Sequence, residues 1–307
     1  MTVFSYRISD KDAGIRLDRF LSEKPELPSR SYLQRLIGEG QVLVDRRPVK
    51  SNYRLQAGKE ITVSVPEPKE LSVEAEPMDL DILYEDEDVV LVNKPKGMVV
   101  HPGAGHLTGT LVNGLMYHCR GQLSGINGIL RPGIVHRIDM DTTGILVVCK
   151  NDQAHKSIAA QLKEHSITRR YWAIVHGRID EEEITVDAPI GRHPTERKKM
   201  SIHARNGKPA ITHITVIKQF KGYAYVECRL ETGRTHQIRV HMASIGHPLL
   251  GDRVYGPDKC PFPQLRGQTL HAGILGFVHP RTGQYMEFNA PLPEYFRHLL
   301  DKLEKIK

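Results

Sequence analysis

Residues 131–149 read RPGIVHRIDMDTTGILVVC, and this stretch indicates both the fold and the chemistry of the chain. Pro and Gly near the start predict a loop, and the apolar run at the end predicts a strand that this loop enters. The loop brings His136, Arg137, Asp139 and Asp141 close together. Because sites are often built on loops that a sheet holds in place, we expect a functional site here.

The charges in this loop suit a nucleophile. A carboxylate with an arginine beside it stays ionised, and an ionised Asp139 is better fitted to nucleophilic attack than to general-acid work. The residues alone leave two alternatives open. One is a surface turn whose Asp and Thr side chains cap backbone groups. The other is a metal-dependent hydrolase that uses His136, Asp139 and nearby histidines.

Spacing argues against a metal site. His236 and His241 are five residues apart, not four as in a helical zinc site, and none of the four cysteines lies in a CxxC pair. A P-loop motif is not found either. We therefore expect neither a metal nor another cofactor.

The region from residue 81 onward predicts a mixed domain. Residues 88–93, 144–149, 170–175 and 223–230 read as strands, and residues 152–165 have apolar positions at helical spacing. Strands outnumber helices and do not alternate with them regularly. The pattern favours an α+β domain with a mixed, largely antiparallel sheet over a doubly wound one.

The first 65 residues predict a small α/β module. Ile15, Leu17, Phe20 and Leu21 suggest a short helix, and a second helix follows Ser29, its expected N-cap, with Leu33, Leu36 and Ile37 on one face. Strands are expected at 41–45 and 60–65, with a turn at 46–48. The module is rich in arginine. Those that can meet phosphates are Arg16, Arg19, Arg30, Arg35, Arg46 and Arg47.

Charge divides the chain into three parts. Residues 1–65 carry a net charge of +4, residues 66–92 carry −9, and residues 93–307 carry +12. Two basic blocks that would attract a polyanion are thus separated by an acidic stretch. Charge alone leaves a merely solubilising surface equally open. We expect an acidic, Pro-rich linker at 66–80 between two domains, 1–65 and 81–307.

Nothing in the sequence points to a membrane. No apolar run reaches the roughly 18–20 residues of a membrane span, and residues 1–7 lack a signal-peptide core. We expect a cytoplasmic protein that acts as a monomer.

Two resemblances extend these inferences. Residues 15–21 (IRLDRFL) and 29–45 (SRSYLQRLIGEGQVLVD) resemble the RNA-binding domain named after small-subunit ribosomal protein S-four. Residues 136–144 (HRIDMDTTG) closely resemble the catalytic motif of the RluA-type pseudouridine synthases. Further family motifs follow the expected order at 92–102 (VNKPKGMVVHP), 168–177 (TRRYWAIVHG), 230–241 (LETGRTHQIRVH) and 270–272 (LHA). Within the family, the domain order and the sequence of residues 98–103 are most similar to those of the RluD subgroup.

The resemblance implies a function and roles for the residues. It implies the pseudouridine synthase fold and the isomerisation of uridines to pseudouridine in structured RNA, most simply large-subunit (23S) ribosomal RNA. Asp139 would be the nucleophile, paired with Arg239, and Tyr171 would lie against the uracil. Arg137, Arg234, His136 and Leu270 would contact or shape the substrate site. Transfer RNA as substrate, and a non-catalytic RNA-binding protein on the same scaffold, remain the alternatives.

Overall fold

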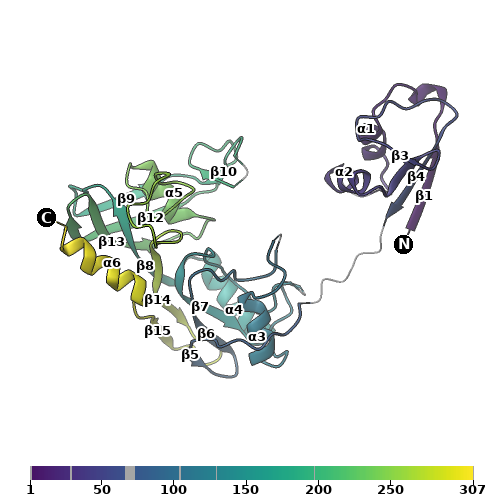
Figure 1. Cartoon of the computed structure of the whole chain (residues 1–307). Helices are drawn as coiled ribbons and strands as arrows, with labels where there is room; N and C mark the ends of the chain where they lie inside the picture. Colours follow the sequence, from purple (N-terminus) through teal and green to yellow (C-terminus); the bar gives the residue numbers. More distant parts are fainter. Residues whose placement is uncertain are drawn as a thin grey trace. The chain divides into compact units, whose positions relative to one another are not determined.

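The computed structural model describes residues 2–27, 30–65, 73–103, 105–128, 130–196 and 198–306, apart from the side chains of Arg30 and Ser31. The chain forms two compact units, Met1–Leu71 and Ser72–Lys307 (Figure 1). Each has a hydrophobic core of its own. Among the described residues, no helix is both long and apolar enough to cross a membrane.

The first unit is a four-stranded antiparallel sheet with two helices packed on it. The strands lie in the order β1-β4-β2-β3. The predicted apolar helix faces are confirmed, because Leu17, Phe20 and Leu21 are buried together with Leu33 and Leu36. The elements are β1 (Thr2–Arg7), α1 (Leu17–Ser22), α2 (Arg30–Gly38), β2 (Val42–Val44), β3 (Arg47–Pro48) and β4 (Glu60–Val65), with a 3-10 turn at Asp10–Asp12.

The turn expected at 46–48 lies slightly earlier. Asp45 and Arg46 have φ angles of 47° and 66°, so these two residues form the tight hairpin turn, and Arg47–Pro48 already belong to β3. The predicted N-cap, Ser29, lies outside the described residues.

The second unit is built on a nine-stranded mixed sheet. The order is β5-β6-β7-β14-β8-β13-β12-β9, and β15 also pairs with β14, at residues 274–278. All pairs are antiparallel except β7 with β14, so the predicted α+β fold on a mixed, largely antiparallel sheet is confirmed. The elements are β5 (Ile82–Glu85), β6 (Val89–Lys94), α3 (Leu111–His118), β7 (Thr143–Cys149), α4 (Asp152–Lys163), β8 (Thr168–His176), β9 (Glu183–Asp187), β10 (Gly191–Arg192), β11 (Met200–Ser201), β12 (Ile211–Phe220), β13 (Tyr223–Leu230), α5 (Gln237–Ser244), β14 (Leu270–Val278), β15 (Tyr285–Asn289) and α6 (Glu294–Glu304).

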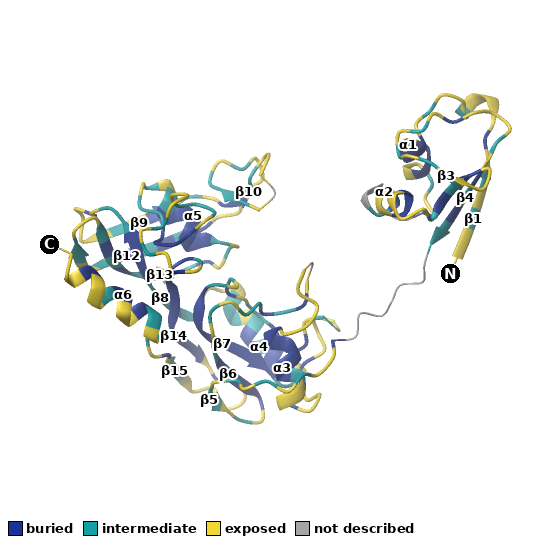
Figure 2. Cartoon of the chain, viewed as in Figure 1, coloured by how far each residue is buried: buried dark blue, intermediate teal, exposed yellow. Residues whose placement is uncertain are grey.

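Helices cover both faces of this sheet, so its central strands are buried on both sides (Figure 2). Alternate residues of β6 and β7 point to opposite faces. Val90, Val92 and Leu146 pack with α3, and Val89 and Leu91 pack with α4. On β8, Tyr171 joins the α3 and α5 cluster, while Trp172 and Ile174 pack against α6. The sheet therefore separates a face with α3 and α5 from a face with α4 and α6.

The acidic segment expected to be a linker differs at its C-terminal end. Residues 66–72 lie outside the described part, but residues 73–80 pack on the second unit. Val73 is buried in its core, and Asn113 of α3 exchanges hydrogen bonds with the backbone of Glu74 and Glu76. Apolar Val73, Met78 and Leu80, set among the acids, explain why this part is held against α3.

Candidate active site

A cleft of about 360 Å³ opens on the face of the sheet that carries α3 and α5. It brings together residues that are far apart in the sequence but share this face. Asp139 comes from the loop before β7, Tyr171 from β8, Arg239 from α5 and Leu270 from β14. The full lining is Arg137, Ile138, Asp139, Thr142, Tyr171, Leu230, Arg234, His236, Gln237, Ile238, Arg239 and Leu270.

A buried lysine, Lys94, holds the turn that carries Asp139. Lys94 is fully buried, and its Nζ donates hydrogen bonds to the carbonyl oxygens of Pro95, Met98 and Met140 at 2.8, 2.8 and 2.9 Å. Burial lowers the pKa of Lys94 to about 7, although the nearby charges of Asp141 and Asp139 oppose this. The backbone at Met140 is thus fixed one residue after the carboxylate.

Gly144 lets the loop pass directly into the sheet. Its φ is 110°, and a Cβ at this position would lie 2.1 Å from the carbonyl oxygen of Ala272. Only glycine fits this backbone conformation and this approach, which begins the parallel pairing of β7 with β14. Asp139 on one side and Leu270 on the other are thereby brought to the same end of the sheet.

Arg239 connects two carboxylates. Its NH1 donates to Asp139 Oδ2 at 2.8 Å, while its Nε and NH2 donate to the two oxygens of Asp252 at 2.7 and 2.9 Å. The Asp252 side chain is fully buried, that of Arg239 is 6% exposed and that of Asp139 18%. Of these three linked side chains, Asp139 is therefore the one that solvent, and hence a substrate, can reach.

The electrostatics of the Arg239–Asp252 pair favour the charged form of both residues. Burial by itself would lower the pKa of Arg239, but the hydrogen bonds and charges of Asp252 and Asp139 raise it above its ordinary value. Burial would raise the pKa of Asp252, yet the Arg239 guanidinium and the Val254 and Tyr255 amides hold it below its usual range. Arg239 thus presents a fixed positive charge to Asp139.

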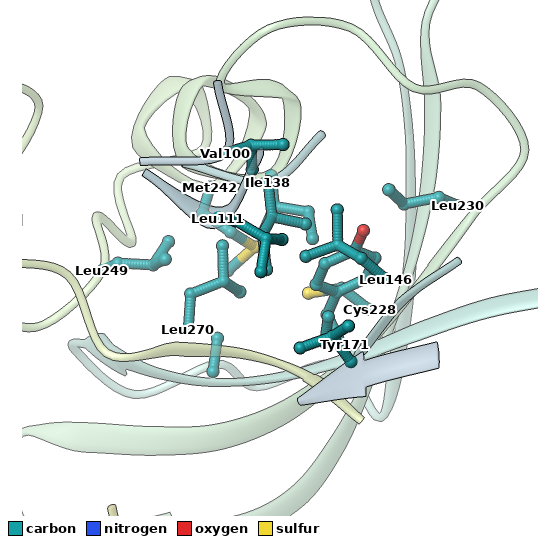
Figure 3. Packing of buried hydrophobic residues seen from close by; sticks show 14 of the residues in the cluster. Val100, Leu111, Ile138, Leu146, Tyr171, Cys228, Leu230, Met242, Leu249 and Leu270 are labelled. Atoms are coloured by element: carbon teal, nitrogen blue, oxygen red, sulfur yellow. The ribbon is translucent and has the colours of Figure 1, made fainter. Parts of the chain in front are cut away.

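Tyr171 and Leu270 form the apolar wall of the cleft. Tyr171 is 8% exposed and Leu270 is 4% exposed, and both pack in the same cluster as Ile138 and Leu230 (Figure 3). Burial raises the pKa of the Tyr171 hydroxyl, and the charge of Asp139 adds to this, so the hydroxyl keeps its proton at neutral pH. An aromatic face and an O–H donor therefore lie beside the carboxylate.

The remaining predicted residues divide into two groups. Arg137, which is exposed, and Arg234 both line the cleft. His136 does not: its Nε2 accepts a hydrogen bond from the Val147 amide at 3.1 Å, and burial lowers its pKa to about 3. A neutral ring that binds the β7 backbone supports the loop from behind, so His136 shapes the site without lining it.

Three residues near Asp139 were not predicted from the sequence. Asp252 and Tyr255 come from a turn at residues 251–256 (GDRVYG), and His236 precedes α5. The glycines that bound this turn, with an Asp and a Tyr between them, were the available signal. Without a spatial link to Arg239, however, they read as an ordinary surface turn.

The donors that a metal hydrolase would need do not gather at Asp139. Within the described residues, the one grouping of three candidate ligands is Asp86, Asp88 and His279. Its members already bind one another and their neighbours: His279 pairs with Asp86 at 2.9 Å, and Arg281 pairs with Asp88 at 2.6 Å. The grouping is a salt-bridged cluster, and it does not include His136 or Asp139.

In the first unit, the arginines predicted to bind RNA lie mostly at the surface. Arg19 and Arg35 are exposed, and each pairs with a glutamate four residues later, just past the end of its helix. Arg46 and Arg47 are exposed at the β2–β3 hairpin. The half-exposed Arg16 is held by Asp18 at 3.0 Å. The side chain of Arg30 lies outside the described part.

Comparison with known proteins identifies the family of the chain. Residues 88–244 match the profile of the RNA pseudouridylate synthases, and residues 15–61 match the S4 domain. An uncharacterised RNA pseudouridine synthase of Bacillus subtilis is 56% identical over 297 residues, which is 97% of each chain. The chain belongs to the RNA pseudouridylate synthase family.

Other members confirm the resemblances drawn from the motifs. The ribosomal large subunit pseudouridine synthase D of Zymomonas mobilis is 46% identical over 305 residues, 96% of each chain. Among solved structures, human RNA pseudouridylate synthase domain containing 1 is 27% identical, with a TM-score of 0.58 over 78% of this chain and 98% of that one. The pseudouridine synthase described here therefore shares both the fold and the family.

Proposed function

We propose that this pseudouridine synthase isomerises specific uridines of large-subunit (23S) ribosomal RNA, with Asp139 as its nucleophile. The observation that carries the proposal is the cleft in which an accessible carboxylate is paired, at 2.8 Å, with the buried guanidinium of Arg239. The reaction breaks the glycosidic bond, turns the uracil and rejoins it through carbon 5. The proposed chemistry draws on protein side chains and on no metal or other cofactor.

Each proposed role follows from position. Arg239 orients the Asp139 carboxylate while it attacks ribose carbon 1, acts on the base, or removes the ribose proton next to that carbon. Tyr171 offers its ring to the uracil and its protonated hydroxyl to proton transfer at carbon 5. Leu270 adds apolar surface to the same wall of the cleft as Tyr171.

A uridine in folded RNA must leave its stack to reach Asp139. Flipping costs a few kcal/mol, which contacts inside the pocket offset. Arg137 is exposed at the mouth of the cleft, two residues before the nucleophile, and we propose that it fills the vacated space or grips the neighbouring phosphate. Arg234 also lines the cleft and adds positive charge for the backbone.

The ribosomal substrate is supported by the relatives. Several that are more than 40% identical along nearly the whole chain are named ribosomal large subunit pseudouridine synthase D. An N-terminal S4 domain with exposed arginines suits structured RNA. Mapping pseudouridines in ribosomal and transfer RNA, with and without the gene, tests the substrate. Sites lost from transfer RNA alone would contradict the ribosomal assignment.

The nucleophile is tested by Asp139→Asn, which keeps the size of the side chain and removes its charge. We expect the variant to bind RNA but to release no tritium from RNA labelled at uracil carbon 5, because a neutral amide is not a nucleophile at this site. Asp301→Asn, on α6 across the sheet, is the matched control and should keep full activity. Substantial turnover by Asp139→Asn would remove Asp139 from its role, and no release by the wild type would favour the non-catalytic alternative.

We further propose that the enzyme acts in the cytoplasm, where ribosomal RNA is made in bacteria, and as a monomer. Light scattering of the purified protein that returns the mass of a dimer would contradict the second point.

A further inference from the structure

A histidine that has no assigned role lies against the nucleophile. His236 lines the cleft, and its Nε2 is 3.8 Å from Oδ1 of Asp139, the oxygen that Arg239 does not bind. Its backbone is in the left-handed conformation, with φ 57° and ψ 21°, immediately before α5. This uncommon conformation for a non-glycine residue directs the ring into the site instead of along the helix.

A chain of hydrogen bonds fixes the ring from the other side. Nδ1 of His236 is 2.8 Å from the hydroxyl of Tyr255, and the same hydroxyl is 2.7 Å from the backbone N–H of Met200 on β11. The amide can only donate, so the hydroxyl accepts from Met200 and has its single hydrogen left to donate to Nδ1. A neutral ring that accepts at Nδ1 carries its own hydrogen on Nε2.

The Asp139 carboxylate, which faces Nε2 of the ring, favours the same tautomer. With the hydrogen on Nε2, an N–H donor faces the Asp139 carboxylate, whereas the other tautomer would turn a lone pair toward its negative charge. Burial lowers the pKa of His236, which favours the neutral form. The charged groups around the ring partly cancel: Asp139 and Asp252 raise that pKa, while Arg239 and Arg137 lower it.

We propose that His236 is a positioning residue, held by Tyr255 and Met200, that orients the free oxygen of Asp139 for attack while Arg239 holds the other. The inference rests on Asp139 being the nucleophile. A separation of 3.8 Å is too long for a hydrogen bond, and such contacts often tighten only when substrate is bound. The β10–β11 hairpin, through Met200, is thereby connected to the nucleophile by three contacts.

A matched pair of variants tests the donor. His236→Gln and His236→Met have unbranched side chains of similar length and inherit the same backbone strain, but only glutamine supplies an N–H near the position of Nε2. We expect the single-turnover rate of tritium release to fall about 10- to 100-fold in His236→Met, the range for a hydrogen bond to a charged group. His236→Gln should recover at least fivefold of that loss, with RNA affinity equal in the two variants.

Tyr255→Phe tests the relay. It removes the donor that keeps Nδ1 unprotonated, so nitrogen-15 shifts should show the His236 ring losing its preference for the hydrogen on Nε2, and the rate at neutral pH should fall by about 3- to 10-fold. A merely structural tyrosine would lower the rate and leave the tautomer unchanged, and that result would overturn the relay.

The tautomer can be read directly in the unaltered protein. Nitrogen-15 chemical shifts of the His236 ring should show a neutral ring protonated on Nε2 at neutral pH, and a ring protonated on Nδ1 would overturn the inference. Equal rates for His236→Met and His236→Gln would also overturn it. Activity in Asp139→Asn would instead overturn the proposed nucleophile, so the two failures are distinguishable.

Discussion

Asp252→Asn probes the support of the active site without touching the cleft. Asp252 binds Arg239 with both carboxylate oxygens and accepts from the amides of Val254 and Tyr255 at 2.9 and 3.2 Å. Asparagine keeps one acceptor oxygen but places an amide NH₂ against the guanidinium. The variant therefore loses one charge-assisted hydrogen bond and the charge of a fully buried partner.

The structure sets the size of the effect. Breaking a buried ion pair by removing one partner costs about 3–5 kcal/mol, and the lower end applies because Asp139 still faces Arg239 at 2.8 Å. With a urea slope of about 3 kcal/mol per molar, the loss corresponds to a midpoint lower by about 1 M. The rate should fall by about 10- to 100-fold, because a shift of about 1 Å at a reacting group costs about 100-fold.

The sign of the pH dependence gives a second measurement. The pKa of Asp252 is below its usual range in the folded protein, so its stabilisation is present above the unfolded value near about 4 and is lost as pH falls through the folded one. The difference in free energy of unfolding between wild type and Asp252→Asn should therefore be largest at neutral pH and should disappear in acid. Urea melts across this range, with Asp301→Asn as control, measure it. A variant with wild-type midpoint and wild-type tritium release would refute the reasoning.

Two further predictions concern other parts of the chain. Lys94→Met removes three buried hydrogen bonds, one of which ties Met140, next to Asp139, to the loop after β6, so we expect unfolding at lower urea and at least a tenfold slower rate. A rate equal to that of the wild type would show that the turn holds its shape alone. Deletion of residues 1–65 removes the basic S4 module, so RNA affinity should drop more than the single-turnover rate and depend less steeply on salt. Unchanged affinity at physiological salt would refute a role for the module.

The strongly apolar elements were predictable from the sequence, and for a physical reason. Strands β6 and β7 contain the apolar runs 89–92 (VVLV) and 145–149 (ILVVC) because helices cover both faces of the sheet there. Helix α4 has one buried face, so Ala154 and Ile158 show the helical period. A strand buried on both faces shows a continuous apolar run, and a helix buried on one face shows apolar residues at helical spacing, so both can be recognised in the sequence.

Helix α5 was not predicted, because its burial hides the period. Residues 237–242 are all buried, and three of them, Gln237, Arg239 and His241, are polar. Each is satisfied by a specific partner: Gln237 binds the β12 backbone and His241 binds the carbonyl of Ala188. Polar residues that are buried for such contacts erase the amphipathic pattern, so only the resemblance to a family pointed to Arg239.

The partner of Arg239 explains why an arginine stands at this position. A guanidinium has several N–H groups in a fixed plane, and here Nε and NH2 form a two-pronged contact with Asp252 while NH1 remains for Asp139. A lysine would offer one compact charge, which cannot bind both oxygens of Asp252 and still meet Asp139 in a fixed direction. The buried carboxylate orients the arginine, and the arginine then orients the exposed carboxylate. The position of the proposed nucleophile thus depends on a fully buried residue, which is why we expect Asp252 to matter to the chemistry although it lies outside the cleft.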